Sequence, residues 1–263
     1  MNGPLLLLIS GGGGEAARYA PISAILAEDY TVVSYDRRGN SRSTGDTTID
    51  LDMAQQARDA AAVIHAMGHD DAYVFGNSGG ANIALQLATD HPAVIRGLVA
   101  HEGPTTPLLP HADTWLAFIE RVHAAFTSHG AAEAFKVFAT ELVGFDTTPQ
   151  QARVAAGEMP PNAEFFMARE YVAISRYNPD LDTIRRNEVP MVTAAGRDSA
   201  DAYYARTARI QAERLGCPYI EFPGNHLGFI FEAEAFATAL RSALDGIKPE
   251  TPSGRSTNLR DAQ

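Results

Sequence analysis

Short, continuous apolar runs alternate with longer amphipathic stretches along most of this chain. We predict a buried strand over each of six such runs: 5–9, 30–35, 71–75, 96–101, 189–195 and 218–222. Between them, apolar residues recur with helical spacing over 15–28, 51–67, 81–88, 202–215 and 233–244. Strands that alternate with helices are typical of an α/β fold, a mostly parallel sheet with helices on both faces.

One long segment interrupts this alternation. Between residues 104 and 187 the pattern predicts no strand, and the helical stretches are 111–129, 131–143, 150–156 and 163–177. We therefore predict a core made of residues 1–103 and 188–247, with 104–187 inserted as a helical lid. Residues 248–263 are polar and rich in Pro, Ser and Gly, and we expect this tail to be disordered.

The sequence Gly76-Asn77-Ser78-Gly79-Gly80 lies between a predicted strand and a predicted helix. A Gly-x-Ser-x-Gly turn in this setting forces the serine into a strained backbone conformation and exposes its hydroxyl at the start of the helix. Ser78 is therefore the candidate nucleophile. The alternative is an ordinary Gly/Ser turn.

Together with the inserted segment and a late histidine, this turn makes the chain resemble the α/β-hydrolase superfamily, in its serine-hydrolase branch. The likeness covers residues 5–244, and its other motifs are Ser10-Gly11-Gly12, 36–43 and 222–229. They correspond to the family's oxyanion loop, the turn after its next strand and its catalytic-histidine loop. Residues 101–105 are similar to those of fungal zearalenone lactonases, whose catalytic acid is a glutamate at this point.

The family usually has two further strands before the oxyanion loop, whereas Met1 lies almost on that loop here. We expect this N-terminal hairpin to be missing in this branch, or the true start to lie upstream.

A serine hydroxyl needs a general base, and the base needs an orienting acid. His226 is the candidate base, because it lies in a glycine-flanked loop late in the chain; the alternative is a surface histidine. Glu102 and Asp198 compete as the acid. The resemblance favours the position of Asp198, but Asp198 also precedes a predicted helix and would suit a cap. Glu102 has no comparable structural role, so we favour it and keep Asp198 as the alternative.

The tetrahedral intermediate of acyl transfer carries an oxyanion that needs fixed N–H donors. Gly79, at the start of the predicted helix, is one candidate donor. Gly12 is the other, because four consecutive glycines after the first strand indicate close approach of backbone to a ligand.

Composition narrows the class of partner. The chain has 263 residues and a net charge of −11, which argues against binding to nucleic acid or to an anionic membrane. Cys217 is the only cysteine, so no intrachain disulfide forms and a reducing, cytoplasmic location fits. The apolar run 4–9 is too short to span a membrane and has no basic segment before it. No histidine pair has metal-ligand spacing, so we expect neither metal nor cofactor.

We therefore predict a serine hydrolase that cleaves an ester or lactone of a small apolar molecule through an acyl-enzyme. Aromatic residues of the inserted segment are candidates to line its pocket: Trp115, Phe118, Phe126, Phe135, Phe138, Phe165, Phe166 and Tyr171. One alternative is a ligand receptor on the same fold. The other is an NAD(P)-dependent oxidoreductase, because Gly11-x-Gly13-x-x-Ala16 opens a helix and Asp36 ends the next strand.

Overall fold

The computed structural model describes residues 3–145 and 159–247. Six strands form one parallel sheet, in the order β2-β1-β3-β4-β5-β6. They are β1 (Leu5–Ile9), β2 (Thr31–Ser34), β3 (Ala72–Asn77), β4 (Ile95–His101), β5 (Met191–Gly196) and β6 (Tyr219–Phe222). The predicted α/β fold with a mostly parallel sheet is confirmed, and each predicted apolar run overlaps one of these strands, with ends that differ by at most two residues.

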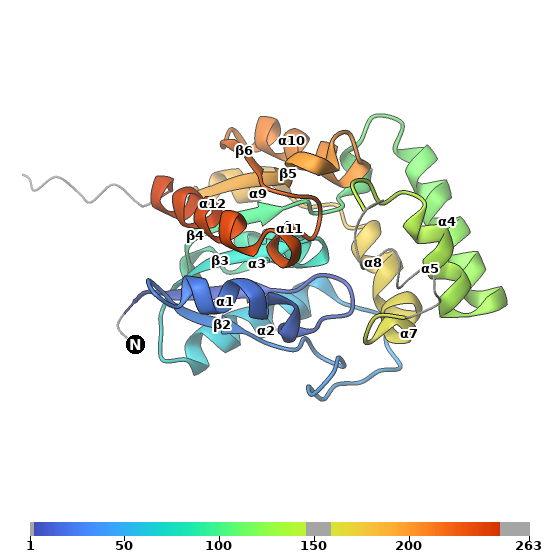
Figure 1. Ribbon diagram of the computed structural model, residues 1–263, viewed down its shortest axis with the longest axis horizontal. Helices are drawn as coiled ribbons and strands as arrows, with labels where there is room; N and C mark the ends of the chain where they lie inside the picture. Colours follow the sequence, from blue (N-terminus) through green and yellow to red (C-terminus); the bar gives the residue numbers. More distant parts are fainter. Residues whose placement is uncertain (1–2, 146–158, 248–263) are drawn as a thin grey trace, which may run out of the picture.

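Helices cover both faces of the sheet (Figure 1). One face carries α2 (Met53–Ala66), α3 (Gly79–Asp90), α9 (Leu181–Arg186) and α10 (Tyr203–Leu215). The other carries η1 (Ala16–Tyr19), α1 (Ala20–Leu26), α11 (Gly228–Phe231) and α12 (Ala233–Gly246). Three further single turns are η2 (Pro92–Val94), η3 (Thr106–Leu108) and η5 (Arg197–Ser199).

The two cores explain why the strands read as continuous apolar runs. Successive side chains of a strand point to opposite faces. Leu5, Leu7 and Ile9 therefore pack under α2 and α3, while Leu6 and Leu8 pack under α1 and α12. Because both faces are buried, nearly every position of such a strand is apolar.

Between β4 and β5, the described residues form helices only. They are η3, α4 (Ala112–His129), α5 (Ala131–Ala139), α7 (Ala163–Phe165), η4 (Phe166–Glu170), α8 (Tyr171–Ser175) and α9. The α4, α5, α7 and α8 helices lie together beyond one end of the sheet, on the right of Figure 1. The predicted helix over 150–156 and the predicted disordered tail over 248–263 fall outside the described residues.

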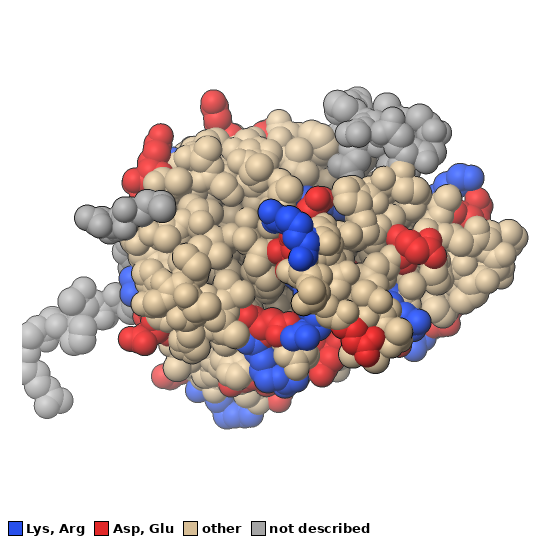
Figure 2. Space-filling model, turned by 90° about the horizontal axis from the view of Figure 1, so that it is seen from below, with Lys and Arg blue, Asp and Glu red and all other residues tan. Residues whose placement is uncertain are grey.

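Charged groups on the surface are mixed in sign. On the face shown in Figure 2, acidic and basic side chains are interspersed. Several form ion pairs, such as Arg38 with Asp59 and Arg197 with Asp198. In the described part of the chain, no helix is both long and apolar enough to cross a membrane.

Candidate active site

The turn between β3 and α3 holds Ser78 in a backbone conformation that L-residues rarely adopt, with φ 57° and ψ −128°. Close backbone packing enforces it. A Cβ on Gly80 would lie 2.0 Å from the carbonyl oxygen of Ile9, and a Cβ on Gly76 would lie 2.3 Å from the carbonyl oxygen of Gly80. Only glycine fits at these two positions, so the turn lies directly against the end of β1. The predicted strand, sharp turn and helix around Ser78 are confirmed.

Glu102 follows β4 and is fully buried, with a φ of 52°. Its Oε1 accepts the N–H of Gly196 at 2.8 Å, and its Oε2 lies 2.6 Å from Nδ1 of His226. Burial opposes ionisation, but His101, His226 and the nearby Ser199 hydroxyl outweigh it and hold the pKa of Glu102 below its usual value. An ionised carboxylate only accepts, so Nδ1 of His226 carries the proton and Nε2 is left as the basic nitrogen.

A hydrogen bond from Asn77 holds the loop that carries His226. The Asn77 amide donates to the carbonyl oxygen of His226 at 3.1 Å and to Nδ1 of His101 at 2.9 Å. Burial lowers the pKa of His101 to about 4, so this ring is neutral at pH 7 and accepts that bond. Because Asn77 directly precedes Ser78, its bond to the carbonyl oxygen of His226 links the serine turn to the loop that carries His226.

Ser78 and His226 line the same pocket. Within the described residues the Ser78 hydroxyl forms no hydrogen bond, so the expected contact between its oxygen and His226 stays a prediction. The His226 ring packs at 4.6 Å from the ring of Tyr204, which limits its movement.

The carboxylate of Asp198 is paired with Arg197 and not with His226. Both of its carboxylate oxygens accept hydrogen bonds from Arg197, and its side chain is 44% exposed. The predicted cap is wrong: Asp198 sits inside the short η5 turn, and α10 begins only after Ala202, which makes no side-chain cap. The β5–α10 connection contains an extra turn that the sequence pattern did not indicate.

The glycine loop after β1 approaches the serine closely. A Cβ on Gly11 would lie 2.8 Å from the Cβ of Ser78, and a Cβ on Gly12 would lie 2.2 Å from the ring of Phe166. Two N–H groups of this loop are engaged: Gly13 donates to Glu170 and Gly14 to the carbonyl of Gly11. In the described part of the chain the N–H of Gly12 has no acceptor.

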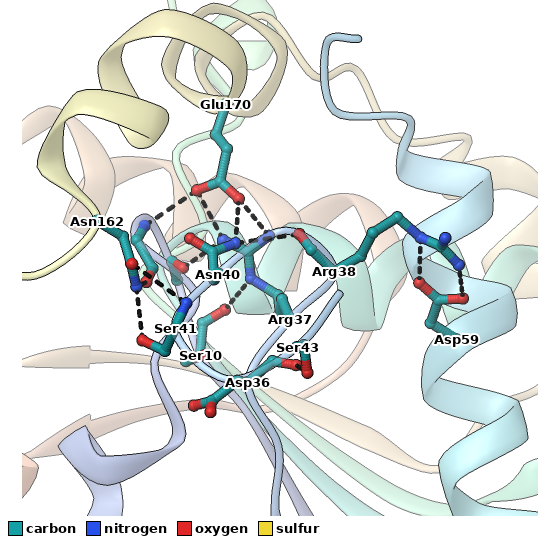
Figure 3. Close-up of polar contacts among 12 residues, drawn as sticks. Ser10, Asp36, Arg37, Arg38, Asn40, Ser41, Ser43, Asp59, Asn162 and Glu170 are labelled. Atoms are coloured by element: carbon teal, nitrogen blue, oxygen red, sulfur yellow. Dashed lines mark hydrogen bonds and ion pairs between the residues drawn. The ribbon is translucent and has the colours of Figure 1, made fainter. Parts of the chain in front are cut away.

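A buried ion pair fixes this loop to the helical insertion (Figure 3). Nη1 of Arg37 lies 2.8 Å from Oε1 of Glu170, and both side chains are at most 1% exposed. Glu170 also accepts from the Asn40 amide at 2.9 Å and from the Gly13 N–H at 3.0 Å. Arg37 in turn donates to the carbonyl oxygens of Ser10 and Gly11.

Asn162 adds a second contact from the insertion, since its amide donates to the carbonyl of Gly13 at 2.7 Å. Both polar groups of the Gly13 backbone are thus held by residues of the insertion. Sequence reasoning missed Arg37, Glu170 and Asn162 as parts of the site. The one available signal was that Glu170 occupies a helical stretch otherwise rich in apolar residues.

Asp36, the residue expected to bind a ribose in the oxidoreductase alternative, is engaged inside the protein. Its Oδ1 accepts the N–H of Ala16 at 2.8 Å, and its Oδ2 accepts from Arg42 at 2.6 Å. The carboxylate therefore closes the turn after β2 onto the start of η1.

The pocket above Ser78 is mostly apolar. Its lining from the insertion includes Phe135, Phe138 and Phe166, and its lining from the core includes Leu227 and Phe229. Of the other candidate aromatics, Tyr171 lines a smaller neighbouring pocket that also contains Ser78 and His226. Three belong to the insertion's own core, namely Trp115, Phe118 and Phe126, while the ring of Phe165 lies against Gly39. Among the described residues, no group of three or more His, Cys, Asp or Glu is placed to hold a metal ion.

Comparisons with known proteins agree with this arrangement. A family model described as alpha/beta hydrolase fold matches residues 4–183. The uncharacterized hydrolase YraK of Bacillus subtilis is 30% identical over 255 residues, which cover 95% of this chain and 92% of that protein.

Two solved structures show the same fold. A thermophilic esterase from Thermogutta terrifontis superposes with a TM-score of 0.76 and 17% identity, covering 94% of this chain and 91% of its own. The enol-lactonase from Burkholderia xenovorans LB400 has a TM-score of 0.71 and 19% identity, with coverage of 93% and 92%.

Replacing Glu170 should destabilise the protein strongly. Glu170→Gln leaves the Arg37 guanidinium buried without its counter-charge, and breaking a buried pair in this way costs about 3–5 kcal/mol in the free energy of unfolding. Glu164→Gln is the matched control, because Glu164 lies on the adjacent turn but is exposed. Urea denaturation of both variants measures the difference.

The double variant Arg37→Met/Glu170→Met removes both charges and should recover part of that stability. The recovery is limited because the Gly13 N–H, the Asn40 amide and the carbonyls of Ser10 and Gly11 lose their partners. Equal stabilities for Glu170→Gln and Glu164→Gln would show that the pair does not hold the insertion to the core.

Proposed function

Because this chain belongs to the α/β-hydrolase family, we propose that it is a serine hydrolase in which Ser78, His226 and Glu102 form the catalytic triad. The observation that carries the proposal is the buried Glu102 carboxylate 2.6 Å from Nδ1 of His226, with His226 and the strained Ser78 on one pocket. The Asp198 alternative has no such geometry, since its carboxylate faces Arg197.

In the acylation step, Oγ of Ser78 attacks the carbonyl carbon of the substrate while Nε2 of His226 takes the hydroxyl proton. Glu102 stabilises the imidazolium that forms and keeps Nδ1 protonated throughout. The negative charge moves to the carbonyl oxygen, which we assign to the N–H groups of Gly12 and Gly79. When the tetrahedral intermediate collapses, the bond to the leaving oxygen breaks and His226 returns its proton to that oxygen.

In the deacylation step, water takes the place of the leaving group. Nε2 of His226 removes a proton from it, the hydroxide oxygen bonds to the acyl carbon, and Ser78 leaves with the proton from His226. The products are a carboxylic acid and an alcohol, or a single hydroxy acid when the substrate is a lactone. The enzyme is regenerated without any redox change.

The insertion between β4 and β5 acts as a lid in this proposal. Its aromatic side chains provide the apolar wall opposite Ser78, which suits the apolar part of a small ester or lactone. The esterase and the enol-lactonase that share the fold support that class of bond. The fold does not by itself select one substrate.

The two alternative functions lack comparable support. A dinucleotide needs a free acidic group for its ribose, whereas Asp36 is held by Ala16 and Arg42. A receptor needs no general base. In a receptor, the free-energy cost of burying the Glu102 carboxylate beside His226 would therefore bring no functional gain. Turnover of short-chain aryl esters separates a hydrolase from a receptor.

Ser78→Ala should abolish covalent labelling by a fluorophosphonate and lower ester turnover by several orders of magnitude. Alanine removes the attacking oxygen and keeps the turn small. The matched control is Ser23→Ala on α1, which removes only a half-buried hydroxyl that donates to the carbonyl oxygen of Tyr19 and should leave labelling intact. Undiminished labelling of Ser78→Ala in a gel assay would rule Ser78 out as the nucleophile.

Glu102→Gln and Asp198→Asn should differ in kind. The first removes the charge that supports the His226 imidazolium; in a serine protease the equivalent change lowers kcat about 10⁴-fold. The second breaks an exposed ion pair worth at most about 1 kcal/mol and should leave kcat nearly unchanged. Steady-state kinetics and thermal melts on both variants test this, and the reverse ranking of kcat would transfer the acid role to Asp198.

A further inference from the structure

The pocket above Ser78 contains one permanently charged side chain among the described residues. Arg18, on the η1 turn directly after the glycine loop, lines it together with Ser78 and His226. A methyl group on Gly13 would lie 3.7 Å from Nη2 of Arg18, which places the guanidinium beside the loop that holds Gly12. The rest of the pocket wall is dominated by aromatic and aliphatic side chains.

Arg18 forms no ion pair or hydrogen bond within the described residues. The acidic groups that act on its charge are Glu15 and Glu170, and neither forms an ion pair or a hydrogen bond with it. Glu170 is already occupied by Arg37, Asn40 and the Gly13 N–H (Figure 3). Every other arginine described in the neighbourhood of this loop has a carboxylate partner: Arg37 has Glu170, and Arg42 has Asp36.

An unpaired guanidinium in such a place is unfavourable. Burial lowers the pKa of Arg18, but arginine stays protonated in proteins, so the charge persists while part of its hydration is lost. A bound anion would replace the lost hydration with charge-assisted hydrogen bonds, for which the planar guanidinium is well shaped. The chain has a net charge of −11, so an unpaired positive charge facing the pocket is not explained by a general excess of basic residues.

We infer that Arg18 binds an anionic group of the substrate, so that the preferred substrate is a small ester or lactone carrying a carboxylate in addition to the bond that is cleaved. This rests on the proposed function, and it names the substrate class of the same site. The apolar wall formed by Phe138, Phe166 and Phe229 then holds the hydrocarbon chain between the two polar ends.

Paired substrates that differ only in the carboxylate provide the test. One pair places it in the acyl group: p-nitrophenyl hydrogen adipate against p-nitrophenyl hexanoate. The other pair places it in the leaving group: 3-acetoxybenzoate against phenyl acetate. Uncatalysed hydrolysis is subtracted, and kcat/KM is measured for the wild type, Arg18→Met, Arg18→Lys and the control Arg58→Met.

In at least one pair the wild type should prefer the acidic substrate by about 10- to 100-fold in kcat/KM. Arg18→Met should lose this preference, because its kcat/KM falls further for the acidic member of the pair than for the neutral one, and Arg18→Lys should keep part of the preference. Arg58→Met removes one exposed positive charge outside the pocket and should keep the full preference.

The failures are distinguishable. If the wild type hydrolyses the neutral esters but shows no preference in either pair, or if Arg18→Met retains the preference, the role of Arg18 is overturned and the hydrolase proposal stands. If the wild type hydrolyses none of the four compounds and is not labelled by a fluorophosphonate, the proposed function itself is overturned, and the role of Arg18 with it.

Discussion

The turn at Ser78 is the constraint on which the site depends. There is no room for a side chain at Gly76 or Gly80. Because both residues are glycine, α3 can start directly against the end of β1. That close approach strains Ser78, exposes it at the carboxyl edge of the sheet, and brings the glycine loop within contact of its Cβ. Strain of this kind persists only when the surrounding packing determines it.

Two buried carboxylates hold the two parts of the site that face Ser78, which are the His226 loop and the glycine loop. Glu102, from the core, fixes the proton and orientation of His226. Glu170, from the helical insertion, fixes the glycine loop through Arg37 and the N–H of Gly13. Because helices of the insertion both line the pocket and hold that loop, the substrate site and the oxyanion site that we propose depend on the same helices.

Much of this arrangement could be predicted from the sequence, and for physical reasons. A parallel strand buried on both faces is nearly continuously apolar, and a serine turn between strand and helix needs small neighbours, so both can be recognised in a short stretch of sequence. Glu102 was favoured because a carboxylate beside a strand end had no local partner. Glu170 and Arg37 were not predicted, because their pairing joins residues 133 positions apart. The π-helical turn over Phe166–Glu170 also shifts the face that Glu170 presents. The cap assigned to Asp198 failed because the extra η5 turn separates it from α10.

A crystal structure of the protein after reaction with an ester-mimicking phosphonate tests the central claim most directly, because it reports nucleophile, base and oxyanion donors together. The account predicts phosphorus bonded to Oγ of Ser78, with the phosphonyl oxygen about 2.7–3.1 Å from the N–H nitrogens of Gly12 and Gly79. Nε2 of His226 should face the leaving-group side. Phosphorus bonded to another residue, or a phosphonyl oxygen turned away from both N–H groups, would contradict it.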